Sequence, residues 1–165
     1  GGGSGGGGGG SGDLGGSGPG RFDRVLCKEV MHHLEDRSRF LHALRRNRLR
    51  PHARLLIVTR PQVEIDYPLW PAATAVWAAA QPAEAVLVEE LKLAGFTDVH
   101  ACTRAFACSV PVDQWCGLIE SRFWSTFSNF TDEELRAATK EIRARSSSDP
   151  LVFEDRIVLI SAQGE

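Results

Sequence analysis

Residues 22–59 have a strand–helix–strand pattern, which limits the fold classes that this chain can adopt. The segment FDRVLCKE is apolar at its centre, as a buried strand is, and ARLLIVT is a second short apolar run. Between them, Phe40, Leu41 and Leu44 recur at helical spacing, and the arginines of RRNRLR collect where a helix ends, which the helix dipole favours. Two strands joined by a helix predict a βαβ unit with a right-handed crossover, and so an α/β fold.

The chain after residue 59 predicts further helices and strands. They are a helix over 83–94 capped by Gly95, a strand over 97–106, a helix over about 112–124, a second helix from 131, and a last strand over 151–161. Thr131 and Glu134 have the spacing of a capping box, which marks the start of the second helix. Residues 61–82 contain four prolines and no sustained period, so we predict an irregular segment there.

Composition separates a tail from a domain. Only Gly95, Gly117 and Gly164 of the 17 glycines lie outside residues 1–20, and this Gly/Ser-rich tail is predicted to be disordered because it can bury almost no apolar surface. Residues 21–165 predict one domain with its own core. The formal net charge of -2 gives no general attraction to nucleic acid or to an anionic membrane.

The cysteines and the apolar segments bear on the cellular setting. Four cysteines are present without any CxxC spacing, and no apolar leader begins the chain. No apolar stretch approaches the ~20 residues that cross a bilayer. We therefore expect free thiols in a reduced, cytoplasmic setting.

The joint between the first strand and the first helix carries several candidate functional residues. His32 and His33 are adjacent, so on a strand or helix their side chains would point apart, and no cluster at ligand spacing accompanies them; we predict no metal site. Two interpretations remain open: a structural role such as capping the helix, and a base or substrate ligand that works near pH 7. Cys27 suits a small core residue, whereas Lys28 and Glu29 suit either a solvated pair or a cofactor contact.

Two arginine-containing features also have more than one interpretation. Arg122 stands beside Phe123 and Trp124, where it can fix an acidic substrate through a bidentate pair or stack on the rings as part of a lid. The run RRNRLRPHAR, residues 45–54, sits at a helix end without interleaved aromatic residues. This context favours a solvated face over an RNA-binding module.

Four segments, in this order, resemble parts of the small-molecule (type 11-like) class I methyltransferases that use S-adenosylmethionine (SAM). They are FDRVLCKEVMHHLED, LRPHARLLIVTRP, VLVEELKLAGFTDV and VFEDRIVLIS. ESRFWSTFSNFTDEEL is similar to a stretch that precedes the last strand in some of these enzymes. The resemblance covers about residues 21–162. It implies a partial Rossmann-like sheet made of the family's last four strands, with the final strand antiparallel between its neighbours, and a helical lid insertion over about 107–148.

The resemblance also implies an activity and a set of site residues. The activity is SAM-dependent methyl transfer to a small-molecule acceptor, with SAM as the cofactor and a base where the acceptor must lose a proton. The implied residues are Cys27, Lys28 and Glu29 beside the cofactor, His33 or His32 in the catalytic role, and Arg60, Arg122 and Trp124 at the substrate.

Two parts of the family pattern are missing from the sequence. No strand ends in the glycine-rich SAM loop, no acidic strand end is present for the ribose, and GDLGGSG lacks the flanking strand and helix of such a loop. We therefore expect a truncated form with impaired SAM binding. Without a neighbouring strand, the apolar edge at Val25–Cys27 would be unpaired. The alternative function is thus a non-catalytic remnant that binds a protein partner at this edge.

Overall fold

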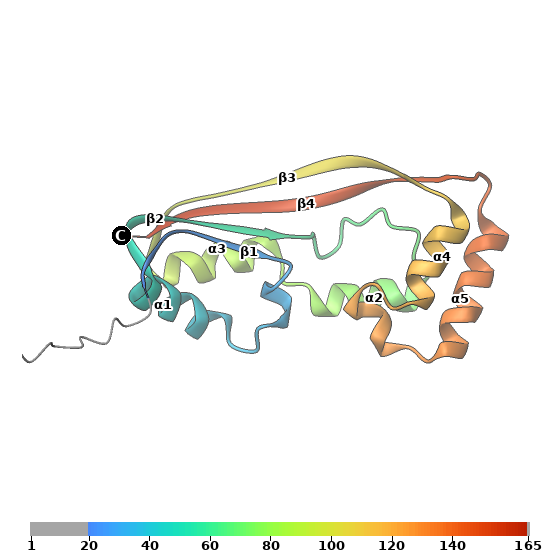
Figure 1. The fold of residues 1–165 in the computed structure, drawn as a ribbon, viewed down its shortest axis with the longest axis horizontal. Coiled ribbons are helices and arrows are strands. Elements are labelled where there is room, and N and C mark those ends of the chain that lie inside the picture. The colour runs from blue at the N-terminus through green and yellow to red at the C-terminus, as the bar shows by residue number, and fades with distance from the viewer. Residues whose placement is uncertain (1–19, 165) are drawn as a thin grey trace, which may run out of the picture.

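The computed structural model describes residues 20–164, so the expected disordered tail over 1–20 falls outside the described residues except for Gly20. Figure 1 shows an elongated molecule with one sheet along its length. The strands are β1 (Phe22–Lys28), β2 (Leu49–Thr59), β3 (Phe96–Val110) and β4 (Leu151–Gly164). The helices are α1 (Arg37–Arg48), α2 (Pro71–Ala80), α3 (Glu84–Leu93), α4 (Val112–Glu120) and α5 (Asp132–Arg145), with 3-10 turns η1 (Met31–His33) and η2 (Ser125–Asn129).

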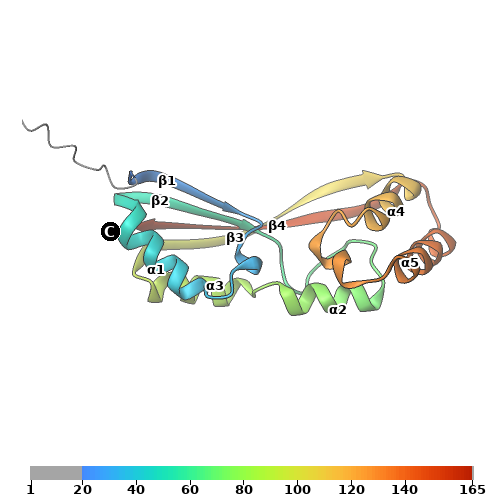
Figure 2. The ribbon, with the colours of Figure 1, turned by 60° about the horizontal axis from the view of Figure 1, so that its bottom comes forward.

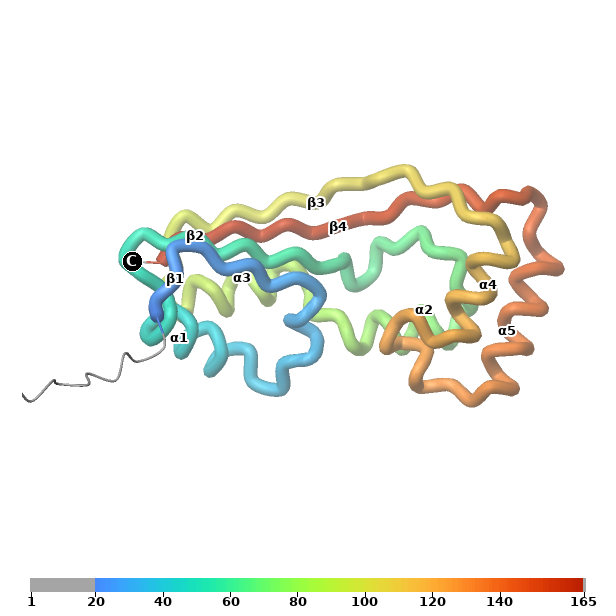
Figure 3. The backbone as a smooth tube through the Cα atoms, viewed as in Figure 1, coloured from blue at the N-terminus to red at the C-terminus, as the bar shows by residue number. Residues whose placement is uncertain are grey.

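The sheet has the strand order β1-β2-β4-β3. β1 and β2 are parallel and connected through α1, as the βαβ pattern predicts, whereas β4 lies between β2 and β3 and is antiparallel to both (Figure 3). This arrangement confirms the predicted α/β fold class and the position of the last strand. Among the described residues β1 pairs with β2 alone, so its outer edge has no strand partner there.

The helix ends follow the expected chemistry. The side chain of Asp36 caps α1 by accepting a hydrogen bond from the backbone N of Arg39 at 2.8 Å, and basic residues occupy the last turn. Thr131 and Glu134 form both bonds of the predicted capping box at the start of α5. None of the helices within residues 20–164 has the length and hydropathy that a membrane span requires.

The segment predicted to be irregular, residues 61–82, contains α2, so that prediction is wrong for its second half. Pro71 occupies the start of the helix, where the missing N–H costs no hydrogen bond. Ala73 and Trp77 are buried on one side of α2, and the remaining alanines supply high helix propensity without an apolar period. Pro71 thus begins the helix and Pro82 follows it, so neither proline interrupts it.

The boundaries of the helical insertion also differ from expectation. β3 was expected to end near residue 106, but it continues to Val110 because its pairing with β4 extends as far as Leu151. The insertion therefore starts with α4 and not at residue 107. The first helix ends at Glu120, short of residue 124, and the chain passes into η2. We refer to residues 112–145, which hold α4, η2 and α5, as the lid.

A first core fills the space between the sheet and helices α1 and α3, which lie along one face (Figure 2). Its buried residues alternate along the strands, as in Leu55 and Ile57 of β2 and Val158 and Ile160 of β4. The opposite face of β1 and β2 is open among the described residues, and Leu26 is 60% exposed on it.

A second core joins α2 to the lid at the far ends of β3 and β4, around residues such as Trp115. The residues of β4 that pack here are Leu151 and Phe153, whereas Val158 and Ile160 pack in the first core. Odd and even residues of a strand point to opposite faces. β4 therefore presents one face to the first core and its other face to the second.

Replacing Ile57 by Ala should lower the free energy of unfolding by about 2–5 kcal/mol, because a fully buried side chain leaves a cavity when it is truncated. The matched control is Leu56→Ala, one residue earlier on the open face, which should cost less than about 1 kcal/mol. Denaturant unfolding followed by circular dichroism measures both. Equal losses would contradict the assignment of the two faces of β2.

Candidate functional site

A cavity of about 350 Å³ opens at the carboxyl ends of the parallel strands β1 and β2. The turn after β1, the residue after β2, the end of α2 and the start of η2 all contribute to its wall. The lining residues are Lys28, Glu29, His32, His33, Arg60, Trp77, Gln81, Phe123, Trp124, Ser125 and Thr126. In doubly wound α/β sheets ligands bind beyond the carboxyl ends of the strands, and this cavity has that position.

Glu29 occupies a strained position at the edge of the cavity. Its φ of 51° lies in the left-handed region, which is uncommon for a residue other than glycine. The backbone N of Glu29 still donates to the carbonyl of Val58 on β2 at 2.8 Å, so the turn stays fixed to the sheet. This turn carries the chain from β1 directly into η1 and so sets Glu29 beside the histidines in the cavity wall.

Arg60 connects the sheet to the aromatic residues beneath the lid. Its Nε lies 3.0 Å from Glu29 Oε1, and its Nη1 donates to Asp155 Oδ1 on β4. The hydroxyl of Tyr67 donates to the same carboxylate oxygen. The guanidinium carbon lies 5.7 Å from the ring centroid of Tyr67 and 6.0 Å from that of Trp124, within the range of a cation–π contact. We refer to Arg60, Glu29, Asp155 and Tyr67 as the Arg60 cluster.

Burial and contacts with charged partners both shift the pKa values of the residues in the Arg60 cluster. Burial raises the pKa of Glu29, and the nearby Arg60 offsets this only in part. Burial and then the hydrogen bond to Asp155 raise the pKa of Tyr67, which keeps the phenol protonated. Burial lowers the pKa of Arg60, but Tyr67, Glu29 and Asp155 outweigh it, so the net shift is upward and the guanidinium stays charged. One cation therefore faces two carboxylates.

The two histidines lie in ring contact at the cavity. Adjacent residues were expected to point apart, but in the 3-10 turn η1 their ring centroids are 4.0 Å apart. Burial, and to a smaller extent His33, lower the pKa of His32, so its imidazole is neutral near pH 7. The Nδ1 of His32 is buried and has no hydrogen-bond partner. Within residues 20–164 no three His, Cys, Asp or Glu side chains are grouped as a metal site would require.

The structure brings six of the eight candidate site residues to one cavity. They are Lys28, Glu29, His32, His33, Arg60 and Trp124. Cys27 precedes them on β1, with its side chain buried in the first core. Arg122 lies elsewhere: its Nη2 binds Asp132 at 2.6 Å and the carbonyl of Phe130 at 3.0 Å. Arg122 therefore fastens the start of α5 and does not contact the cavity.

Sequence reasoning missed two members of the Arg60 cluster. Asp155 lies in LVFEDRIVLIS, where consecutive charged residues interrupt an apolar strand, and that interruption is a signal that could have identified it. Tyr67 lies in the segment predicted to be irregular and carried no local signal. Asp155 reaches Arg60 from a strand 95 residues later in the chain, whereas Tyr67 lies only seven residues after Arg60.

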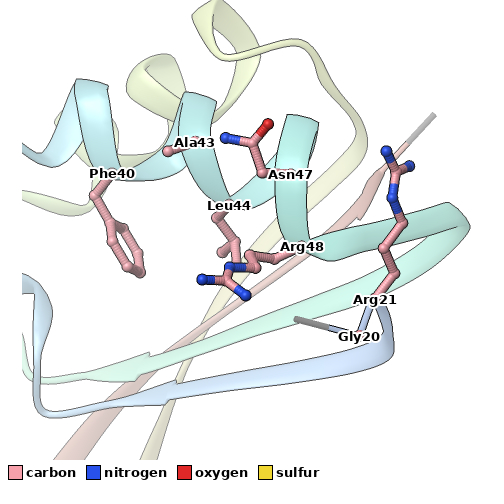
Figure 4. A pocket seen from close by; sticks show the side chains of 7 residues that line it. All are labelled: Gly20, Arg21, Phe40, Ala43, Leu44, Asn47 and Arg48. Carbon is pink, nitrogen blue, oxygen red and sulfur yellow. The ribbon is translucent and has the colours of Figure 1, made fainter. Parts of the chain in front are cut away.

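A second cavity, of about 700 Å³, lies at the opposite end of the sheet near the start of β1 (Figure 4). Phe40 and Leu44 of α1 form its apolar side, and Arg21 and Arg48 supply its charges. Among the residues that the structure describes, no carboxylate or imidazole lines it. The 350 Å³ cavity, which has both, is therefore the better candidate for acid–base chemistry.

No protein-family model matches the sequence, and no curated protein does. Several solved structures are similar to the structure of this chain. A candidate methyltransferase from Bacillus halodurans is 18% identical with a TM-score of 0.52, covering 87% of this chain and 70% of that protein. The YcgJ protein from Bacillus subtilis is 12% identical with a TM-score of 0.54, covering 88% and 64%. Phosphoethanolamine N-methyltransferase 2 from Haemonchus contortus is 14% identical with a TM-score of 0.45, covering 86% and 33%.

The two likenesses with TM-scores above 0.5 establish the fold alone: the chain has an α/β fold similar to that of the candidate methyltransferase. It spans between 33% and 70% of the lengths of these three proteins. The resemblance in the sequence implies SAM as cofactor, and residues 20–164 do not form the glycine-rich loop of a SAM site. The described glycines lie before β1, after α3, in α4 and at the end of β4, so none belongs to a glycine-rich loop that leads from a strand into a helix, and no described strand pairs with the outer edge of β1.

The imidazole of His32 should titrate below its ordinary pKa of 6.5, because burial disfavours its charged form. Nuclear magnetic resonance of the ring signals across pH measures this. Replacing His33 by Gln should move the pKa of His32 upward, since a neighbouring positive charge is removed. A pKa of His32 at or above 6.5 would contradict the described packing of η1.

Proposed function

We propose that this chain forms the acceptor-binding half of a SAM-dependent methyltransferase that acts on a small molecule. One observation carries the proposal: a cavity at the carboxyl ends of two parallel strands holds a carboxylate, a neutral imidazole and aromatic walls together. The methyltransferase fold supports the reaction class. Four unpaired cysteines within residues 20–164 agree with a reduced, cytoplasmic setting.

The residues of the cavity would serve the acceptor. Methyl transfer is an in-line displacement, for which the protein supplies orientation, exclusion of water and a base. Trp77 and Trp124 form apolar walls that exclude water, and the Arg60 cluster fixes those walls to the sheet. His32, or the exposed His33 in contact with it, would take the acceptor's proton.

At millimolar SAM, methyl transfer from labelled SAM into a small-molecule extract should fall by about 10²–10⁴ when the base is removed, as in His32→Gln or His33→Gln. The matched control is His42→Gln on α1, an exposed side chain whose ring forms a hydrogen bond with the carbonyl of Ser38. This control should keep full activity. Equal loss in all three variants, or transfer unaffected by the cavity variants, would contradict the proposed site.

The chain by itself should bind SAM weakly or not at all, because its described residues supply only part of a SAM site. Isothermal titration calorimetry measures this directly, with cooperative unfolding as the check that the chain is folded. Micromolar binding of SAM would contradict the expectation of impaired cofactor binding.

A second candidate function is the binding of a protein partner at the outer edge of β1. The observation in its favour is that this edge has no strand partner among the described residues, while Phe22 and Leu26 on β1 are more than half exposed. A stable complex that is lost in Leu26→Lys would support this function. Leu93→Lys, on the exposed side of α3, is the control that should leave the complex intact. A monomer at all concentrations, with no partner captured through β1, would contradict it.

A further inference from the structure

The outer edge of β3 is the longer of the two edges of the sheet. β3 spans 15 residues and, within residues 20–164, pairs with β4 alone. Its regular pairing with β4 runs from His100 to Val110, after an irregularity between Thr97 and His100. Figure 1 shows β3 along the top of the molecule, on the side away from the helices. The backbone groups on this edge are therefore in position to pair with a further strand.

β3 lacks the features by which natural strands discourage pairing at an exposed edge. Every residue from 100 to 107 is exposed, and Phe106 is 53% exposed. From residue 100 to Val110 the strand contains no proline, and Arg104 is its one permanently charged side chain. β1, the other edge, has the sequence FDRVLCK, with three charges in 7 residues. Charges and proline oppose strand addition, so β3 is better suited than β1 to receive a strand.

The regular part of β3 is complementary to a second copy of itself. When a two-fold axis relates two antiparallel strands, each residue lies opposite the residue at the same distance beyond the axis. Residues 100–110 are centred on Ala105, so an axis at Ala105 allows the whole stretch to pair with a second copy. Ala105 then lies opposite Ala105 of the second copy, and no two like charges face each other.

The other pairs in this register are also compatible. Arg104 lies opposite Phe106 of the second copy, within the range of a cation–π contact, and the two-fold axis produces this pair twice. Cys102 lies opposite Cys108 of the second copy. The small residues between them fill the other side of the strand. An axis at Arg104 would instead set two arginines opposite each other, which disfavours that register.

We propose that two copies of this chain associate by antiparallel pairing of β3 with β3, in the register centred on Ala105. The sheet then continues across the interface, and Phe106 of each copy is covered by the other. Three observations carry the inference: the long unpaired edge, its lack of protecting charges, and its complementarity to itself. No residue of β3 lines the 350 Å³ cavity, so the association does not depend on the proposed function.

Ala105 tests the register because it lies opposite itself. Ala105→Lys and Ala105→Glu each place two like charges on the axis and should weaken self-association by about fivefold or more. An equal mixture of the two variants should restore the dimer, because opposite charges then meet, and this recovery shows that both variants are folded. Analytical ultracentrifugation follows the mass, which should rise with concentration from 18.0 kDa toward twice that value.

Two matched controls separate the register from a general effect of charge. Ala107→Lys adds the same charge to the same side of β3, but it lies opposite Thr103 of the second copy, and the dimer should persist. Leu26→Lys changes the exposed face of β1, at the other edge of the sheet, and should also leave the dimer intact.

The two cysteines of β3 give an independent test of the register. Opposed residues have Cα atoms about 4.5–5.5 Å apart, which suits a disulfide. With diamide as oxidant, the S–H bonds of Cys102 in one copy and Cys108 in the other should break, and an S–S bond should form as diamide takes up two electrons and two protons. Within one chain the two residues are about 20 Å apart along the strand, too far to be bridged.

Single serine variants make the disulfide test specific. Cys102→Ser alone and Cys108→Ser alone should each give no linked dimer, whereas an equal mixture of the two should give one. A linked dimer of Cys108→Ser alone would join Cys102 to Cys102 and overturn the proposed register. A chain that stays monomeric at every concentration, a Lys and Glu mixture that does not recover the dimer, or loss of the dimer in Leu26→Lys would overturn association through β3.

Discussion

The pairing of Arg60 with carboxylates on both sides of it is the interaction on which the rest of the site depends. Arg60 directly follows β2; Glu29 follows the neighbouring parallel strand, and Asp155 lies on the antiparallel strand at the other side of β2. Tyr67 and Trp124 then bring the aromatic residues of the second core against the same guanidinium. A half-buried charge placed between three segments fixes their relative positions, because each partner would be left unpaired if it moved away.

The path of β4 explains why the cavity forms at this point. Val158 and Ile160 point into the first core, whereas Leu151 and Phe153 point into the second, so the packed face of the strand changes along its length. Asp155 lies between the two stretches, where neither core covers the sheet completely. A polar cluster is stable there because its groups pair with one another and remain partly hydrated. The cavity is therefore the junction between two apolar cores, and its charges lie where the apolar packing is interrupted.

Local sequence patterns predicted the parts of this arrangement that depend on neighbours in the chain. The βαβ unit follows from two apolar runs and a helical stripe, and Lys28, Glu29, His32 and His33 reach one cavity because a single strand end carries them. The contacts of Asp155 with Arg60 and Tyr67 join segments far apart in the chain, which no spacing rule can supply. Tyr67 lies only seven residues after Arg60, but the irregular segment between them follows no period that would place its hydroxyl there. α2 was missed because its alanines form a helix by propensity and packing of Trp77, without an apolar period. Arg122 was placed at the substrate from its aromatic neighbours, but Asp132, ten residues later, holds it at the start of α5.

The measurement that tests the central role of Arg60 most directly is a double-mutant cycle between Arg60→Met and Asp155→Asn, read as free energies of unfolding. If the pair joins the sheet to the second core, the two changes should be coupled by at least about 1 kcal/mol, because either substitution alone leaves the other group unpaired in a half-buried site. Losses that add to within about 0.5 kcal/mol would show that the two groups act independently. That result would contradict the account of the cavity as a junction fixed by Arg60.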